Sequence, residues 1–213
     1  MKNCWAKLLS CQKERSCKTG ASSLLIAHSE KEVTERGPIG PVLDLRLDAL
    51  NFANEPILRD IALQVGRSET LALVGPSGVG KTSLLRIFGG LETRYEGSCD
   101  VAGRVAMVFQ EPTLLPWRSV RDNLCIIAKI SPAEAMDALV EVGLSERGDA
   151  FPNTLSLGQQ RRLSLARAFA IKPDLLLMDE PFVSLDPALV EEMMALFAKL
   201  RAAHKVLRSS KPC

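Results

Sequence analysis

A short apolar run followed at once by a glycine-rich loop constrains the fold more than any other feature of the sequence. The run, Thr70–Val74, has the length and character of a strand covered on both faces of a sheet. The loop after it has the spacing Gly-x-x-x-x-Gly-Lys-Thr and leads into residues 81–89, which place Leu84, Leu85 and Phe88 on one helical face. A strand, a glycine turn and a helix in this order predict an α/β domain.

The same loop has the chemical groups that bind phosphate. Glycines let backbone N–H groups approach an anion without a Cβ in the way, and the new helix adds its positive N-terminal end. In this P-loop pattern the Lys81 amine reaches the β- and γ-phosphates of a nucleotide, and the Thr82 hydroxyl binds Mg²⁺. A glycine turn that fits the pattern by chance is the alternative. The nucleotide-contacting residues predicted here are Gly75, Pro76, Ser77, Gly78, Val79, Gly80, Lys81, Thr82 and Ser83.

Patterns typical of strands and helices continue along the chain from residue 42. Alternating apolar and polar residues predict half-buried strands at 42–50 and 57–65. Apolar runs predict further strands, and amphipathic or capped segments predict helices, with Ser131-Pro132-Ala133-Glu134 as an N-cap followed by proline in the first turn. These strands are expected at 105–109 and 174–178, and the helices at 120–143, 159–171 and 187–203. Strands that alternate with helices favour a largely parallel sheet.

Residues 1–40 show no sustained periodicity and end in the breaker-rich stretch Gly37–Pro41. We therefore expect a disordered extension at 1–40 and a folded domain at 41–213. A mitochondrial-type presequence and a start codon placed too far upstream are alternative interpretations. Four glutamates in the segment argue against the presequence, since such segments avoid acidic residues.

Composition excludes several classes of protein. A formal net charge of +2 over 213 residues is too small to favour nucleic acid as a partner. No apolar run approaches the roughly 18 residues that span a bilayer, so membrane association is expected only through a partner. The six cysteines lack Cys-x-x-Cys spacing and the two histidines lie far from them, which favours reduced thiols over a metal site or disulfides.

Two acidic residues directly follow the predicted strand at 174–178. Asp179 is positioned to hold Mg²⁺, and Glu180 to act as the general base that activates the attacking water. Two acids after an apolar run usually mark only the end of a strand. In a chain with a P-loop, the catalytic interpretation is favoured.

Four further features make the chain resemble the ATP-binding subunits of ABC transporters. Leu155–Arg162 looks like the signature Leu-Ser-Gly-Gly-Gln, Phe109–Pro112 like the Q-loop, and Ser184–Asp186 like the D-loop. Phe52 lies 23 positions before Gly75, where the family places an aromatic ring that stacks on adenine. A core aromatic is the alternative interpretation of Phe52.

The resemblance implies an α/β fold: a P-loop NTPase core with a small antiparallel β-subdomain and an α-helical signature subdomain at about 113–157. It implies ATP and Mg²⁺ as ligands, with Gln110 as a further catalytic residue and Mg²⁺ ligand. Two subunits would pack head to tail, so that each contacts the other's ATP through Ser156, Gly158, Gln159 and Asp186. The implied partners are transmembrane permease subunits and, indirectly, a solute-binding protein. The implied location is cytoplasmic, peripheral on the inner face of the membrane.

The stretch Gln110–Trp117 is similar to the ATPases of importers for nitrate, taurine and aliphatic sulfonates, so a subunit powering import of a small solute is the first functional hypothesis. Trp117 would contact a membrane partner or belong to the core of the helical subdomain. Two departures bear on activity. Leu157 replaces the first signature glycine, and the polar residues 206–213 stand where the family has a core strand followed by a switch histidine. A C-terminally incomplete domain is thus expected, and a truncated nucleotide-binding protein with little or no ATPase activity is the second hypothesis. A soluble ABC ATPase acting on ribosomes or DNA is the third.

Overall fold

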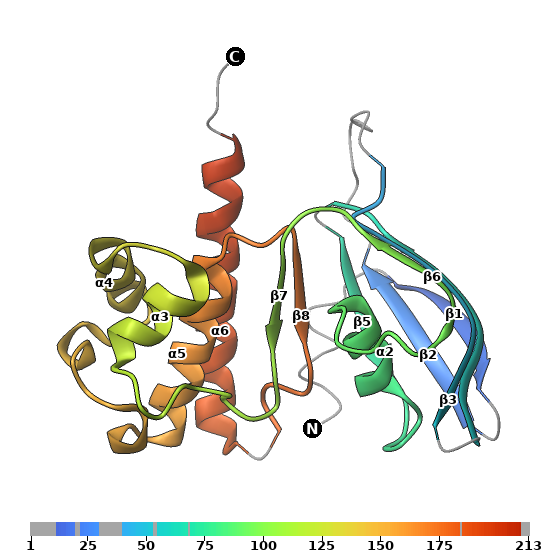
Figure 1. The fold of residues 1–213 in the computed structure, drawn as a ribbon, viewed down its shortest axis with the longest axis horizontal. Helices are drawn as coiled ribbons and strands as arrows, with labels where there is room; N and C mark the ends of the chain where they lie inside the picture. The colour runs from blue at the N-terminus through green and yellow to red at the C-terminus, as the bar shows by residue number, and fades with distance from the viewer. Residues whose placement is uncertain are drawn as a thin grey trace. The chain divides into compact units, whose positions relative to one another are not determined.

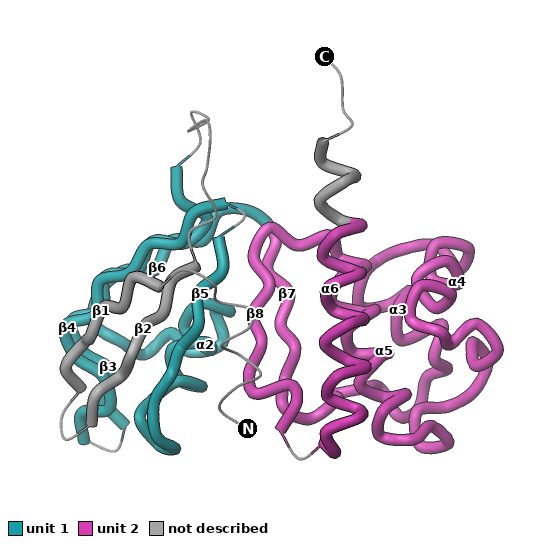
Figure 2. The backbone as a smooth tube through the Cα atoms, turned by 180° about the vertical axis from the view of Figure 1, so that it is seen from behind, with its two compact units in different colours: residues 1–103 teal, residues 104–213 magenta. Residues whose placement is uncertain are grey.

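The chain divides into two compact units, unit 1 (residues 1–103) and unit 2 (residues 104–213) (Figure 2). The computed structural model describes residues 12–19, 22–29, 40–52, 55–67, 69–183 and 185–209, with the backbone alone at 12–19, 22–29 and 204–209. Within these residues, none of the helices combines the length and the apolar character needed to cross a bilayer.

An antiparallel sheet of order β4-β3-β6 forms one part of unit 1. Strand β3 (Leu43–Phe52) lies in the middle, between β4 (Glu55–Val65) and β6 (Glu96–Val101). Alternate side chains of β3 and β4 are buried, as predicted for half-buried strands. The buried set is Leu43, Leu45, Leu47, Leu50, Leu58, Ile61, Leu63 and Val65.

A second antiparallel sheet, of order β1-β2-β5, joins β1 (Gln12–Thr19) and β2 (Ser22–Ser29) to β5 (Thr70–Val74). This differs from the disordered extension and the parallel, fully covered strand predicted from the sequence. Strands pair through backbone N–H and C=O groups, which are the same whatever the side chains. Residues 12–29 have no sustained apolar periodicity, so their pairing with β5 could not be predicted from the sequence. The rest of the segment predicted as an extension, residues 1–11, 20–21 and 30–39, lies outside the described residues.

Unit 2 is built around the parallel pair of β7 (Val105–Val108) and β8 (Leu175–Met178). Helix α5 (Leu157–Ala170) contacts β7 on one side and helices α3 (Val120–Ala128) and α4 (Pro132–Glu141) on the other (Figure 1). Short 3-10 turns, η1 (Ser145–Arg147) and η2 (Pro152–Thr154), connect α4 to α5. The last helix, α6 (Pro187–Ser209), extends beyond its predicted end at residue 203.

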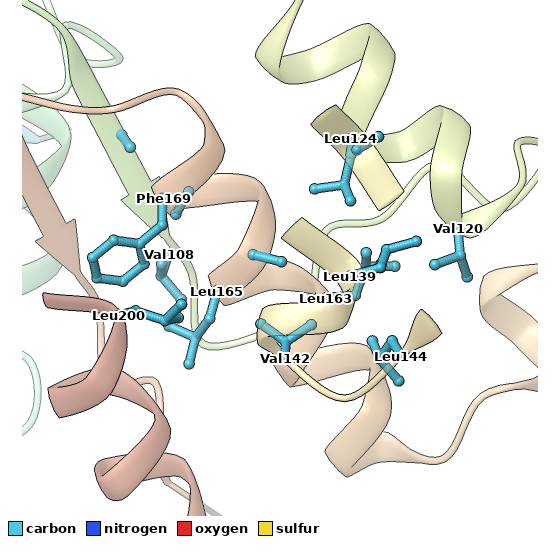
Figure 3. Packing of buried hydrophobic residues seen from close by; sticks show 14 of the residues in the cluster. Val108, Val120, Leu124, Leu139, Val142, Leu144, Leu163, Leu165, Phe169 and Leu200 are labelled. Atoms are coloured by element: carbon cyan, nitrogen blue, oxygen red, sulfur yellow. The ribbon is translucent and has the colours of Figure 1, made fainter. Parts of the chain in front are cut away.

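The core of unit 2 surrounds α5 (Figure 3). Leu163, Leu165 and Phe169 of α5 are buried among apolar side chains from the neighbouring helices and β7. The Phe169 ring meets Phe197 of α6 edge to face, with ring centroids 5.9 Å apart. Because α5 is buried along most of its length, it is the element that links the parts of unit 2.

The start of α4 follows the predicted cap. The Ser131 side chain accepts from the Glu134 N–H, the Glu134 carboxylate accepts from the Ser131 N–H, and Pro132 occupies the first turn. Trp117, by contrast, is 69% exposed. The core alternative for Trp117 is therefore wrong, because its ring lies on the surface.

Asn123 holds the turn that leads into α3 and is 0% exposed. Its Oδ1 accepts the Leu115 N–H at 2.8 Å, and its Nδ2 donates to the carbonyls of Leu115, Arg118 and Ser119. Asn123→Ala is expected to lower the free energy of unfolding by about 3 kcal/mol, because it removes four hydrogen bonds made by a fully buried side chain and leaves a cavity there. Urea unfolding followed by circular dichroism measures the change. The control is exposed Asn153→Ala, and equal unfolding midpoints for the two variants would contradict the prediction.

Candidate functional site

The glycine-rich loop connects β5 to helix α2 (Lys81–Phe88) in unit 1. Gly78 and Gly80 have φ angles of +81° and +97°, in the left-handed region that favours glycine. Gly80 is the N-cap of α2 and has no side chain to bond the first N–H groups of the helix. These N–H groups and the positive end of the helix suit an anion.

Gly80 also sets how the loop packs on β4. A Cβ there would lie 2.7 Å from Leu58 Cδ2 and 3.0 Å from Ile57 Cγ2. Val79 beside it is buried, whereas Pro76, Ser77 and Gly78 are exposed. The base of the loop is therefore fixed against the antiparallel sheet, while its tip faces solvent.

The Lys81 amine lies over this loop. Its Nζ donates to the Gly75 carbonyl at 3.0 Å and to the Pro76 carbonyl at 2.9 Å. The next two helix residues, Thr82 and Ser83, are partly buried. An ammonium group, helix N–H groups and a hydroxyl together fit a phosphate chain with an oxygen-liganded cation such as Mg²⁺.

Gln110 and Asp179 lie at the same edge of the parallel pair in unit 2. Val108 pairs with Met178 at the carboxyl ends of β7 and β8, and the Asp179 N–H donates to the Val108 carbonyl at 2.9 Å. Gln110 follows β7 by two residues and is exposed. Ligands of α/β sheets bind at the carboxyl ends of the strands, so this edge is where the predicted metal ligands belong.

Glu180 has a strained backbone. Its φ is +46°, and the turn is closed by the Val183 N–H, which donates to the Glu180 carbonyl at 3.2 Å. A non-glycine residue in this region costs about 1–3 kcal/mol, and such strain gathers at functional sites. The side chain is exposed, as a group that meets substrate must be.

The predicted signature forms the start of α5. Ser156 is the N-cap: its Oγ accepts the Gln159 N–H at 3.2 Å, and Gln159 Oε1 accepts the Ser156 N–H at 3.0 Å. The helix begins at Leu157, two residues before the predicted start at Gln159, because the capping box makes Ser156 the N-cap. The Leu157 side chain is 47% exposed. At Gly158, a Cβ would lie 3.1 Å from Leu189 Cδ1 of α6, a tight contact that the Leu189 side chain would have to shift to relieve.

Phe52 lies at the end of β3 and is 73% exposed, so the alternative of a core aromatic is wrong. Asp186 caps α6, since its Oδ1 accepts the Leu189 N–H at 3.0 Å. Ser184 of the predicted D-loop lies outside the described residues. The site residues thus fall into two groups. Phe52 and residues 75–83 belong to unit 1, and Gln110, Ser156, Gly158, Gln159, Asp179, Glu180 and Asp186 belong to unit 2.

Sequence reasoning missed two arginines of α5, Arg161 and Arg167, each 8% exposed. Burial lowers the pKa of both guanidinium groups, because it disfavours their charged form. Arg161 and Ser164 border a cavity of about 10 Å³, room for about one water molecule. The signal in the sequence was the presence of arginines among the apolar residues of 161–169, although the same stretch also holds Arg162, which the sequence alone does not separate from the two buried ones.

Comparison with known proteins identifies the family of this chain and agrees with its fold. A family model described as ABC transporter matches residues 58–183. An aliphatic sulfonates import ATP-binding protein of Granulibacter bethesdensis is 43% identical over 167 residues, which cover 78% of this chain and 70% of that protein. A protein of the same description from Frankia alni is 45% identical, over 72% of this chain and 63% of that protein. The chain thus spans about two thirds of the length of these curated relatives.

Two solved structures share the fold. A metal-chelate type ABC transporter in an inward-facing conformation aligns with a TM-score of 0.66 and 22% identity, over 78% of this chain and 71% of that one. The cbiO1 protein of Clostridium perfringens, part of the ABC transporter complex cbiONQ, aligns with a TM-score of 0.63 and 23% identity, over 78% and 76%. The likeness confirms the predicted fold class, a P-loop NTPase core with an antiparallel β-subdomain and a helical subdomain.

Proposed function

Because this chain belongs to the ABC transporter family, we propose that it binds ATP and hydrolyses it to power the import of a small solute. The observation that carries the proposal is the loop between β5 and α2. It combines left-handed glycines, the N-terminus of a helix and the Lys81 ammonium within hydrogen-bond distance of the loop's carbonyls. These groups suit the β- and γ-phosphates of ATP.

In the proposed reaction, the side chains of unit 2 act on metal and water. Asp179 and Gln110, at the end of the parallel strands, and Thr82 of α2 are the proposed Mg²⁺ ligands. The metal, when bound, neutralises charge that develops on the phosphate oxygens. The Glu180 carboxylate accepts a proton from the attacking water, and its exposed position supports that role. The exposed Phe52 ring stacks on adenine.

A second copy of the chain is the proposed partner at the start of α5. The Ser156 hydroxyl and the helix N–H groups there can donate to an anion, and Asp186 lies at the start of α6. In the proposed head-to-tail dimer, Ser156, Gly158, Gln159 and Asp186 contact the ATP that is bound to the other subunit. ATP would then favour the dimer and hydrolysis would release it.

The substrate class and location follow from the relatives. Both are described as importing aliphatic sulfonates, so a sulfonate or similar small anion is the proposed solute of the whole transporter. Permease subunits would hold this chain on the inner face of the cell membrane and link it to a solute-binding protein. The exposed Trp117 ring is the proposed contact with a permease subunit, since tryptophan is common among the residues that contribute most to protein–protein binding.

The test is ATP binding and phosphate release by the purified chain, with and without Mg²⁺. Mg²⁺-dependent turnover, with binding that competes with ADP, is the expected result. Binding without turnover would favour the second hypothesis, a nucleotide-binding protein that does not hydrolyse ATP. A folded sample that neither binds nor hydrolyses ATP would refute the proposal.

A further inference from the structure

We propose that Arg161 and Arg167 of α5 are positioning residues that tie the signature helix to the loops bearing Glu180 and Gln110. The expected effect on ATP turnover rests on the proposed function. The hydrogen bonds from the two arginines to these loops, called the two ties below, lie within unit 2 and do not depend on it. Arg161 bonds the segment after Glu180, and Arg167 bonds the segment after Gln110.

The tie from Arg167 is a fork on one residue. Its Nη1 donates to the Thr113 carbonyl at 2.7 Å, and its Nη2 donates to Thr113 Oγ1 at 3.0 Å. Thr113 follows Gln110 by three residues, and its N–H donates to the Glu111 carbonyl at 2.8 Å. A planar guanidinium with two parallel bonds fixes direction as well as distance.

The tie from Arg161 spans the turn that follows Glu180. Its Nη1 donates to the Pro181 carbonyl, and its Nη2 donates to the Val183 carbonyl at 3.3 Å. Phe109 and Pro112 beside Gln110, and Pro181 and Phe182 after Glu180, border the same small cavity as Arg161. The loop that bears Gln110 and the loop that bears Glu180 therefore both come close to α5 near Arg161.

These ties are hard to break because both cations are buried and bond to carbonyl or hydroxyl oxygens. In the part of the chain that the structure describes, no carboxylate forms an ion pair with Arg161 or Arg167. A loop that moved away from α5 would leave a desolvated guanidinium without its acceptors. Loop and helix therefore move together, so a displacement of the Ser156 end of α5 is passed to Gln110 and Glu180.

Arg162 on the same helix provides a matched control. It forms an ion pair with Glu192 of α6 and bonds neither loop. We would prepare Arg161→Gln, Arg167→Gln and Arg162→Gln, with Arg161→Lys and Arg167→Lys as conservative variants. Each is measured for ATP affinity, for turnover per bound ATP and for hydrogen exchange of the backbone amides.

Arg161→Gln and Arg167→Gln are expected to lower turnover per bound ATP by about 100-fold, the effect of misplacing reacting groups by about 1 Å. ATP affinity should stay within about threefold, as for a site left intact. Exchange should quicken at Thr113 in Arg167→Gln and at Val183 in Arg161→Gln, and at neither in Arg162→Gln. The lysine variants should recover part of both signals, since one ammonium still reaches one carbonyl.

Exchange and turnover equal to those of Arg162→Gln would overturn the proposal. So would a lowered melting temperature with unchanged turnover per bound ATP, the pattern of a purely structural role. If the wild-type chain does not hydrolyse ATP, the proposed function fails, and the exchange pattern still decides whether the two ties exist. If a glutamine variant does not fold, the matching lysine variant supplies the same comparison.

Discussion

Replacing Lys81 with alanine is expected to weaken ATP binding by about 10- to 100-fold, because hydrogen bonds to a charged group contribute about 1.5–3 kcal/mol. Turnover at saturating ATP should fall by a further factor of about 100 to 1,000, the usual cost of removing a donor that stabilises transition-state charge. The Lys81 amine lies beside the Gly75 and Pro76 carbonyls, where the loop would receive phosphate. A fluorescent ATP analogue measures binding, and phosphate release measures turnover.

The control for this variant is Arg86→Ala at the other end of α2, where the side chain is exposed. It removes the same charge from the same helix, so it should leave both quantities unchanged if the effect of Lys81 is local. Circular dichroism of both variants checks that unit 1 remains folded. Equal ATP affinities for Lys81→Ala and the wild type would exclude the loop as the phosphate site.

Replacing Glu180 with glutamine is expected to lower turnover by about 100- to 10,000-fold, the contribution of a positioned general base. The amide keeps the shape of the side chain but cannot take a proton from water. ATP binding should be retained or tightened, since a negative charge near the γ-phosphate is removed. The measurement is a single-turnover assay with labelled ATP, in parallel with binding.

Glu191→Gln provides the comparison, since Glu191 is an exposed carboxylate on α6. It should behave as the wild type. Substantial turnover by Glu180→Gln would assign the base role to another group. In that case the positive φ of Glu180 would be attributed to the turn in which the Val183 N–H donates to the Glu180 carbonyl, and not to catalysis.

The sequence determined most of the local structure of this protein. The strand, glycine loop and helix at residues 70–88 are where periodicity and turn chemistry predicted them, because glycine spacing and apolar period act within a few residues. The cap at Ser131 and the acid pair after β8 were predicted for the same reason. The family resemblance also followed from residues alone, and the comparisons confirm it.

Only the tertiary structure decided which strands pair and which polar groups are buried. The pairing of β2 with β5 and the exposure of Phe52 and Trp117 depend on segments distant in sequence. The same is true of the arginines of α5: a surface cation and a buried cation look alike in a sequence. The carbonyls of Thr113, Pro181 and Val183, far along the chain, provide acceptors that make burial of Arg161 and Arg167 possible. A buried charge needs partners that the fold must bring to it, so the ties to the two loops are a property of the folded unit.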